Sequence, residues 1–314
     1  QKFGLGRNFA NKIWNASRFI IMNLKPEDVA ANLCVFYASS NMNFADKWIL
    51  SRFYQMLQKV ETAVESYRFN EASSVFYEFF WHEFCDWYIE FSKPQISEKH
   101  TQVVLYKVLE KSLRVLHPIM PFITEEIWHT LSQTTKCKSD ALVIQGWPHI
   151  QKQIIDKKID SQMQTLIDSI VAIRNLRAAW NIAPNTLINI SINAGEDTTK
   201  LFNENFVYIK NLARVGHLLI GKDIKKPPKS ATAVVKNIEI YIPLEGFIDL
   251  KKEQIRLLKK KAEINDITKG VKAKLKNKQF LKKAPAEVIE REKARQAELS
   301  DTLKRLTANL KDLD

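Results

Sequence analysis

The sequence has few cysteines and few glycines, and both shortages exclude kinds of site. Only three cysteines, Cys34, Cys85 and Cys137, occur in 314 residues, and no two have a CxxC spacing. We therefore expect a reducing compartment and no structural zinc site. The eight glycines form neither GxxxxGK[ST] nor GxGxxG, and HExxH is also absent. Phosphate-binding loops and metalloprotease helices are therefore not indicated.

Long apolar runs are also missing. No segment approaches the about 20 apolar residues of a transmembrane helix, and no signal or transit pattern precedes the first helical segment. The chain begins with Gln1 and not with methionine, so we expect a fragment or a processed chain. Together with the cysteine usage, these features predict a cytoplasmic protein without a membrane partner.

Catalytic groups are equally scarce. The segment WHEFCDW brings together His82, Glu83, Cys85 and Asp86, but no second cluster of metal-binding residues accompanies it. We expect these side chains to pack in a helix or to form polar bonds on its surface. His117, next to Pro118, is expected to end a helix as a hydrogen-bonded residue. The sequence therefore predicts a binding protein with no catalytic residue, no metal site and no cofactor of its own.

Positive charge is concentrated near the C-terminus. The net charge is +13, and the last 64 residues contribute +9 of it, with 19 basic and 10 acidic residues. Residues 267–286 hold seven lysines and no acid. Such asymmetry indicates a polyanionic partner, with nucleic acid as the first candidate and an acidic membrane surface as the second.

The same C-terminal region has the apolar spacing of a coiled coil. Its apolar residues recur three, four or seven positions apart in two runs, namely Leu257, Ile264, Ile267, Val271 and Leu275, then Leu299, Leu303, Leu306, Leu310 and Leu313. The runs predict two antiparallel helices of about 28 residues, which project roughly 40 Å. A homodimeric coiled coil is the alternative, although the excess of lysine would be repulsive in a symmetric dimer.

The rest of the chain is predicted to be mainly α. Residues 1–150 read as a helical bundle, with a long aromatic helix ended by Pro94 and a later helix capped by Thr124. Residues 151–246 read as a small α/β unit with strands at 186–193, 215–221 and 233–244. Residues 247–314 form the basic coiled-coil hairpin.

The first helix carries an unusual polar face. At about 100° per residue, one arc holds amides, cations and one ring, namely Arg7, Asn8, Asn11, Lys12, Asn15, Arg18 and Phe19. The other arc is apolar and includes Phe9, Ile13 and Trp14. Amides, cations and a ring suit a single-stranded RNA loop, which offers base edges, phosphates and stacking surfaces. The alternative is a solvated face whose amides bond to a neighbouring helix.

Five segments carry a family resemblance. RNFANKIWNASRF, DWYIEFSKP, LHPIMPFITEEIWH, AIRNLRAAWNIAP and KAPAEV, in this order, resemble the C-terminal half of bacterial valyl-tRNA synthetases, which are class I enzymes. The resemblance implies an anticodon-binding bundle at 1–150, a connecting domain at 151–246 and a tRNA-binding arm at 247–314. The HIGH and KMSKS signatures and a recognisable editing domain are absent. The parent enzyme would join valine to tRNA(Val) with ATP and magnesium in an N-terminal catalytic domain missing from this chain.

The resemblance also assigns expected sites and partners. The anticodon-binding candidates are Arg7, Asn11, Lys12, Asn15, Arg18 and Phe19. The candidates for binding the tRNA core are Lys272, Lys274, Lys276, Lys278, Lys282 and Lys283. The expected partners are tRNA(Val) and the missing catalytic domain, and the chain is expected to be a monomer. The asparagines could instead contact that catalytic domain. A free-standing RNA-binding protein and a dimeric coiled-coil scaffold are the remaining alternatives.

Overall fold

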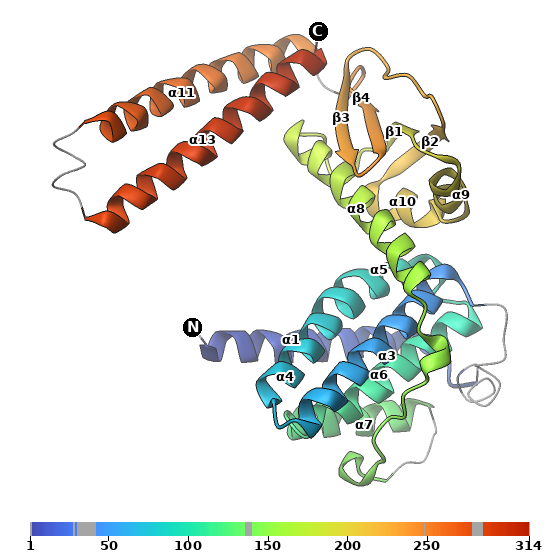
Figure 1. Ribbon diagram of the computed structural model, residues 1–314. Helices are drawn as coiled ribbons and strands as arrows, with labels where there is room; N and C mark the ends of the chain where they lie inside the picture. Colours follow the sequence, from blue (N-terminus) through green and yellow to red (C-terminus); the bar gives the residue numbers. More distant parts are fainter. Residues whose placement is uncertain are drawn as a thin grey trace. The chain divides into compact units, whose positions relative to one another are not determined.

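The computed structural model describes residues 2–27, 29, 42–135, 140–247, 249–277 and 285–313. Contacts divide the chain into two compact units, Gln1–Ile167 and Asp168–Asp314, which we call the N-terminal and C-terminal units. Helix α8 (Lys157–Ala179) crosses this division. The predicted mainly α fold is confirmed, with one small sheet in the C-terminal unit (Figure 1). The three-part domain division remains a prediction.

The N-terminal unit is a bundle of long helices. Its main elements are α1 (Lys2–Asn23), α3 (Phe44–Glu65), α6 (Lys99–Leu116), α7 (Pro121–Thr135) and a helical segment between α3 and α6, with short 3₁₀ turns at η4 (Leu142–Ile144) and η5 (Lys152–Ile154). Helix α3 starts after Asn43, whose side chain accepts a hydrogen bond from the Asp46 N–H and so satisfies a free helix donor. Helix α1 contacts α6 and α7 and buries Ile13 and Ile20 completely.

Between α3 and α6, residues 69–95 are helical throughout and are called the aromatic segment, and the middle of this segment is wider than an α-helix. It comprises α4 (Phe69–Tyr77), the π-helical stretch η2 (Glu78–Tyr88), α5 (Ile89–Ser92) and the 3₁₀ turn η3 (Lys93–Gln95), which contains Pro94. The rings of Phe76, Phe80, Phe84 and Tyr88 follow one another, with centroids 5.4–5.9 Å apart. In an α-helix, residues four apart drift about 40° per step. A π turn holds more residues than an α turn, so residues four apart drift in the opposite direction there. The two kinds of turn together keep the four rings on one buried side.

The predicted cap of α7 is wrong. The helix begins at Pro121, whose fixed φ and missing N–H suit a first helical position. Thr124 is therefore inside the helix and fully buried. Its Oγ1 lies 2.8 Å from both Met120 O and His117 Nδ1. The expectation that His117 ends a helix as a hydrogen-bonded residue is confirmed, because it is the C-cap of α6.

The sheet of the C-terminal unit has four strands in the order β2-β1-β4-β3. The strands are β1 (Ile188–Asn193), β2 (Val215–Gly221), β3 (Ser230–Val235) and β4 (Ile238–Pro243). Strands β1 and β2 are parallel, so their connection needs a crossover, which α9 (Glu196–Glu204) and α10 (Phe206–Ala213) provide. The first two predicted strands are thus confirmed.

The single strand predicted at 233–244 is wrong, because this region is the hairpin β3–β4. Val235 pairs with Ile238, and only Lys236 and Asn237 lie between them. Lys236 has a φ of 53°, the left-handed backbone that tight hairpin turns require. The polar Lys236-Asn237 pair between two β-branched runs was the available signal, but neither residue is glycine.

Arg177 and Trp180, near the end of α8, tie the C-terminal unit together. The Arg177 guanidinium, 6% exposed, donates from Nη2 to the carbonyls of Ala183 (2.6 Å) and Thr186 (2.8 Å). Its Nη1 donates to Ala213 O at 3.3 Å. Trp180 is 1% exposed and belongs to the core. One buried cation therefore fixes the loop before β1 and the end of α10.

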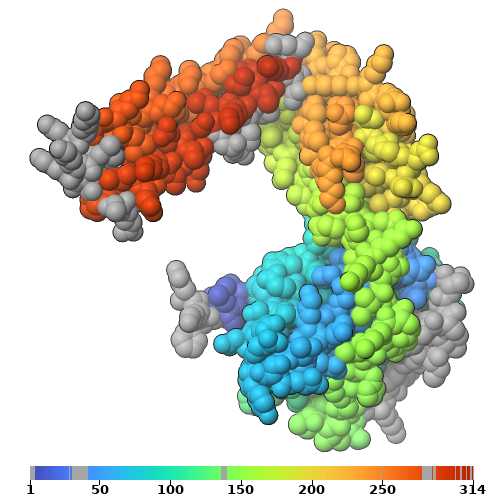
Figure 2. Space-filling view, viewed as in Figure 1, coloured from blue at the N-terminus to red at the C-terminus, as the bar shows by residue number. Residues whose placement is uncertain are grey.

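The C-terminal residues form an arm of two helices, α11 (Leu250–Lys276) and α13 (Ala286–Leu313). The helices lie side by side and run in opposite directions (Figure 1), and their side chains meet along the arm (Figure 2). The prediction of two helices of about 28 residues is confirmed, since they have 27 and 28 residues. Their supercoiling remains a prediction.

One position of the predicted heptad pattern is wrong. Leu257, Val271 and Leu306 are buried as expected, but Ile267 is 43% exposed and its neighbour Thr268 is 4% exposed. Both residues are three or four positions from Ile264 and Val271, so spacing alone allows either. The Thr268 hydroxyl donates to Ile264 O at 2.7 Å, which satisfies its polar group within the interface.

Candidate nucleic-acid interface

Four of the six predicted residues of α1 lie together on its solvent side. Arg7, Asn11, Asn15 and Arg18 are all exposed, opposite the buried Ile13 and Ile20. No acidic residue occurs anywhere in α1. We call these four residues the α1 face. It offers two guanidinium groups and two amides to a ligand, and these groups can bind phosphates and base edges.

Lys12 and Phe19 lie at one edge of this face and contact neighbouring elements. Lys12 Nζ is 2.6 Å from Asp86 Oδ1 and 5.4 Å from the centroid of the Trp81 ring. Phe19 is half-buried, and Lys93 Nζ lies 5.7 Å from its ring centroid. The structure therefore gives both side chains partners within the bundle. Their predicted contacts with RNA remain predictions.

Trp14 is an exposed ring that the sequence analysis assigned to the apolar arc. It is 43% exposed. It lies one helical turn before Arg18, so the two side chains share one side of α1. Its position at the border between the apolar and polar arcs was the sequence feature that could have indicated this exposure. A ring there has an apolar side toward the bundle and an open side toward solvent.

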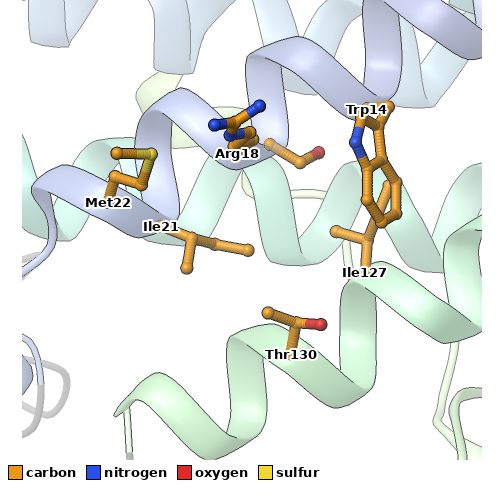
Figure 3. Close-up of a pocket in the computed structure, with 7 residues that line it drawn as sticks. Trp14, Arg18, Ile21, Met22, Ile127 and Thr130 are labelled. Atoms are coloured by element: carbon orange, nitrogen blue, oxygen red, sulfur yellow. The ribbon is translucent and has the colours of Figure 1, made fainter.

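Beside the α1 face, a cavity of about 240 Å³ lies between α1 and α7 (Figure 3). Its lining is mostly apolar and consists of Trp14, Ser17, Arg18, Ile21, Met22, Ile127 and Thr130. Figure 3 shows the Trp14 ring beside Ile127, with Ile21 pointing toward Thr130 across the opening. Met22 is 72% exposed at the border of this cavity.

The polar residues of the aromatic segment have partners within the bundle. Glu83 accepts two hydrogen bonds from Arg52, at 2.6 and 2.8 Å, and this pairing raises the pKa of the guanidinium. His82 Nδ1 lies 3.2 Å from Asp86 Oδ2. Burial raises the pKa of the Cys85 thiol to about 12, so it stays protonated at neutral pH and is a poor nucleophile. Among the described residues, no group of three or more His, Cys, Asp or Glu side chains could hold a metal ion.

The arm presents its predicted lysines near the end of α11. Lys272, Lys274 and Lys276 are all exposed. The other three predicted residues, Lys278, Lys282 and Lys283, lie outside the described residues. Exposed lysines without an acid between them form a positive surface suited to phosphates. Among the described residues, no helix combines the length and the apolar character that a membrane span requires.

Comparison with known families assigns both regions to one class of protein. The anticodon-binding domain of tRNA ligases matches residues 46–192, and the tRNA-binding arm of valyl-tRNA synthetase matches residues 249–314. The fold and these matches thus define tRNA-binding domains of a tRNA ligase. Helix α1 precedes both matched ranges, but it packs on α6 and α7, which lie within the first.

Individual relatives extend the match over nearly the whole chain. The valine–tRNA ligases of Syntrophotalea carbinolica and Thermotoga maritima are each 38% identical to it, over 98% and 99% of its length. The valine–tRNA ligase of Listeria innocua is 37% identical over 92%. The chain spans about a third of the length of these relatives, between 33% and 35%. Over its anticodon-binding domain and its tRNA-binding arm, the chain belongs to the valyl-tRNA synthetase family, and the resemblance carried by the sequence motifs is confirmed.

Proposed function

We propose that this chain binds tRNA(Val), with the N-terminal unit recognising the anticodon loop and the arm binding the tRNA core. The observation that carries the proposal is the presence of two exposed cationic surfaces, one on a helix that packs against the matched anticodon-binding domain and one within the matched tRNA-binding arm. These surfaces are the α1 face and the lysines near the end of α11. Both are free of acidic residues along their own helical stretch.

The α1 face has groups for both parts of a nucleotide. Arg7 and Arg18 supply cations for phosphates, and Asn11 and Asn15 supply amide donors and acceptors for base edges. Base contacts carry sequence information, whereas phosphate contacts mainly position the RNA. We therefore assign anticodon discrimination to Asn11 and Asn15 and general affinity to the two arginines.

The lysines of the arm suit a contact that does not read sequence. Ammonium groups on flexible stems neutralise phosphates as point charges and release counterions, which makes binding strongly dependent on salt. Lys272 and Lys276 are both exposed and lie about one turn apart on the same side of α11, so they can follow one stretch of RNA backbone, whereas Lys274 is exposed on another side of the helix. The arm thus contributes affinity for any folded tRNA.

The whole enzyme's activity belongs to the same proposal. By analogy with the relatives' name, we infer that this chain serves a cytoplasmic valine–tRNA ligase in which a catalytic domain joins valine to tRNA(Val) with ATP and magnesium. In this proposal ATP and magnesium bind in the catalytic domain, and the role of this chain is to bind and orient the tRNA. We further propose that the chain is a monomer, because its lysine-rich arm would repel a second copy. Sedimentation measures this directly, and a stable dimer would contradict it.

A binding titration tests the proposal. The full chain is titrated with a valine tRNA and with the same tRNA carrying an exchanged anticodon, each at two salt concentrations. We expect tighter binding of the valine tRNA at both salt concentrations, and a steep loss of affinity with salt for both RNAs.

Variants of the chain separate anticodon recognition from general affinity. Asn15→Ala should reduce the difference in affinity between the two RNAs. Arg68→Ala, which removes an exposed cation at the N-cap of α4, is the control and should leave that difference unchanged. Equal affinity of the unaltered chain for both tRNAs would contradict anticodon recognition.

A further inference from the structure

The cavity between α1 and α7 differs from an ordinary packing gap because it contains an unsatisfied polar group. Ser17 lines it, is 1% exposed, and its hydroxyl has no hydrogen-bond partner among the described residues. A serine within a helix can usually donate to the carbonyl one turn earlier. Leaving a buried hydroxyl unpaired costs roughly 1–3 kcal/mol. A ligand that offered a hydrogen-bonding atom would recover this cost.

The remaining walls define the shape of such a ligand. Trp14 and Ile127 lie side by side, and Ile21 faces Thr130 across the opening (Figure 3). At about 240 Å³, the space is smaller than the roughly 300–1,000 Å³ of drug-sized pockets, so it suits a single flat ring system. Apolar walls with one buried hydroxyl match a ligand that has two apolar faces and a polar edge.

The charge around the opening indicates what the ring is attached to. Arg18 lines the cavity and is exposed, and Asn15 lies on the neighbouring part of the α1 face. A flat ring with a polar edge, joined to a phosphate that a guanidinium can bind, is a nucleotide of a single-stranded RNA segment. An apolar protein side chain would fill the same walls, but it would leave the Ser17 hydroxyl unpaired and make no use of Arg18.

We propose that the α1–α7 cavity binds one unstacked base of an RNA loop. Trp14 stacks against the base, the Ser17 hydroxyl bonds to its polar edge, and Arg18 binds the adjoining phosphate. The inference rests on the proposed tRNA binding and deepens it by assigning a base-binding site. It adds Trp14 and Ser17 to the residues that contact RNA.

The test uses the full chain and a set of valine tRNAs in which each anticodon-loop nucleotide is replaced in turn by an abasic one. In the unaltered protein, one abasic position should lower affinity by about 5- to 150-fold, the range expected for loss of a stacked base. Trp14→Ala should bind intact tRNA less tightly by a similar factor. The same abasic nucleotide should then lower the affinity of this variant little further, because both changes remove the same contacts. Trp14→Phe should restore most of the affinity.

Two further variants separate base binding from a structural role. Ser17→Ala should reduce severalfold the contribution that the nucleotide at the same position makes to tRNA affinity. It should not lower the melting temperature of the protein, because it removes a hydroxyl that has no partner. Leu5→Ala, which removes an apolar side chain 63% exposed on α1, should change neither the tRNA affinity nor the melting temperature.

The outcomes for the two proposals differ. If the unaltered chain binds tRNA but the effect of Trp14→Ala adds to the effect of every abasic position, the cavity does not hold a base and the proposed function stands. If the unaltered chain does not bind tRNA at all, both proposals fail. If Trp14→Ala leaves tRNA affinity unchanged, Trp14 does not stack on a base and this inference is overturned.

Discussion

Lys12 in α1 and Asp86 in η2 are 74 residues apart in sequence, and their side chains form an ion pair with a distance of 2.6 Å between Nζ and Oδ1. Both side chains are about one-third exposed, so the pair is neither buried nor fully solvated. The pair joins α1 to the aromatic segment. It helps fix the rotation of α1 about its axis, which keeps Asn11 and Asn15 turned toward solvent.

We predict that the Lys12–Asp86 pair contributes to stability more than to RNA binding. Lys12→Ala and Asp86→Ala should each lower the free energy of unfolding, and the double variant should cost less than their sum by about 0.5–1 kcal/mol. Urea denaturation of the four proteins measures this coupling. Arg18→Ala, on the exposed part of the same helix, should leave stability unchanged but weaken tRNA binding more than Lys12→Ala. The reverse order of affinities would show that Lys12 contacts RNA directly.

The lysines of the arm should act through charge alone. We predict that Lys272→Ala combined with Lys274→Ala weakens binding to valine and other tRNAs by the same factor. The slope of log affinity against log salt should flatten by up to about 2, because each phosphate contact on a duplex contributes about 0.9. The matched control is Lys222→Ala with Lys225→Ala, which removes the same charge from exposed positions between β2 and β3. An equal change of slope in the control would mean that net charge, not the arm, determines binding.

Asp46 should make stability depend on pH near neutrality. Burial raises the pKa of its carboxyl from 3.8 to about 7, against the opposing effect of hydrogen bonds from the Tyr88 and Thr101 hydroxyls. The folded state therefore holds this proton more tightly than the unfolded chain does. The contribution of Asp46 to stability is complete below about pH 4 and is lost as pH rises to about 7.

Asp46→Asn tests this dependence. Between pH 4.5 and 8, the free energy of unfolding should fall more for the unaltered chain than for the variant, by a few kcal/mol at most. His100, whose Nε2 lies 3.6 Å from Asp46 Oδ2, has a pKa lowered by burial and acts in the opposite direction as pH falls. Because His100 lies beside Asp46, the difference between the two profiles reports the Asp46 carboxyl together with its effect on His100. Parallel profiles would contradict the raised pKa.

Arg177 should be the most sensitive cation of the C-terminal unit. Its guanidinium donates to carbonyls from the loop before β1 and from the end of α10. Arg177→Ala leaves these carbonyls without their donor, and hydrogen bonds to charged groups contribute about 1.5–3 kcal/mol each. We predict a loss of about 3 kcal/mol or more in the free energy of unfolding. Arg174→Ala, an exposed position whose Nε donates to Leu212 O at 2.8 Å, should cost under about half of that. Similar losses in the two variants would contradict the special role of Arg177.

Long periodic segments were predictable from the sequence because burial imposes their spacing. The helices α3, α6 and α8 and the two helices of the arm follow from apolar residues three and four positions apart. Strands β1 and β2 follow from alternation and β-branched residues. The division of α1 into an apolar and a polar side was also correct for Arg7, Asn11, Asn15 and Arg18.

Features that depend on neighbouring elements were not predictable. The hairpin turn at Lys236 has a left-handed backbone without glycine, so the polar Lys236-Asn237 pair was its only local mark. Spacing permits either Ile267 or Thr268 at the arm interface, and only the partner helix decides between them. Trp14 borders a cavity because residues of α7 lie opposite its side of α1, and the sequence of α1 does not indicate that neighbour. Lys12 has an ion-pair partner 74 residues away that its own helix does not indicate.

The central claim is that the α1 face and the arm both contact one tRNA, and hydroxyl-radical footprinting of valine tRNA with the full chain tests it most directly. We predict two protected regions, one in the anticodon loop and one in the tRNA core. Arg7→Ala with Arg18→Ala should reduce the first, and Lys272→Ala with Lys274→Ala should reduce the second. A footprint confined to one region, or unchanged by both pairs of substitutions, would contradict the claim.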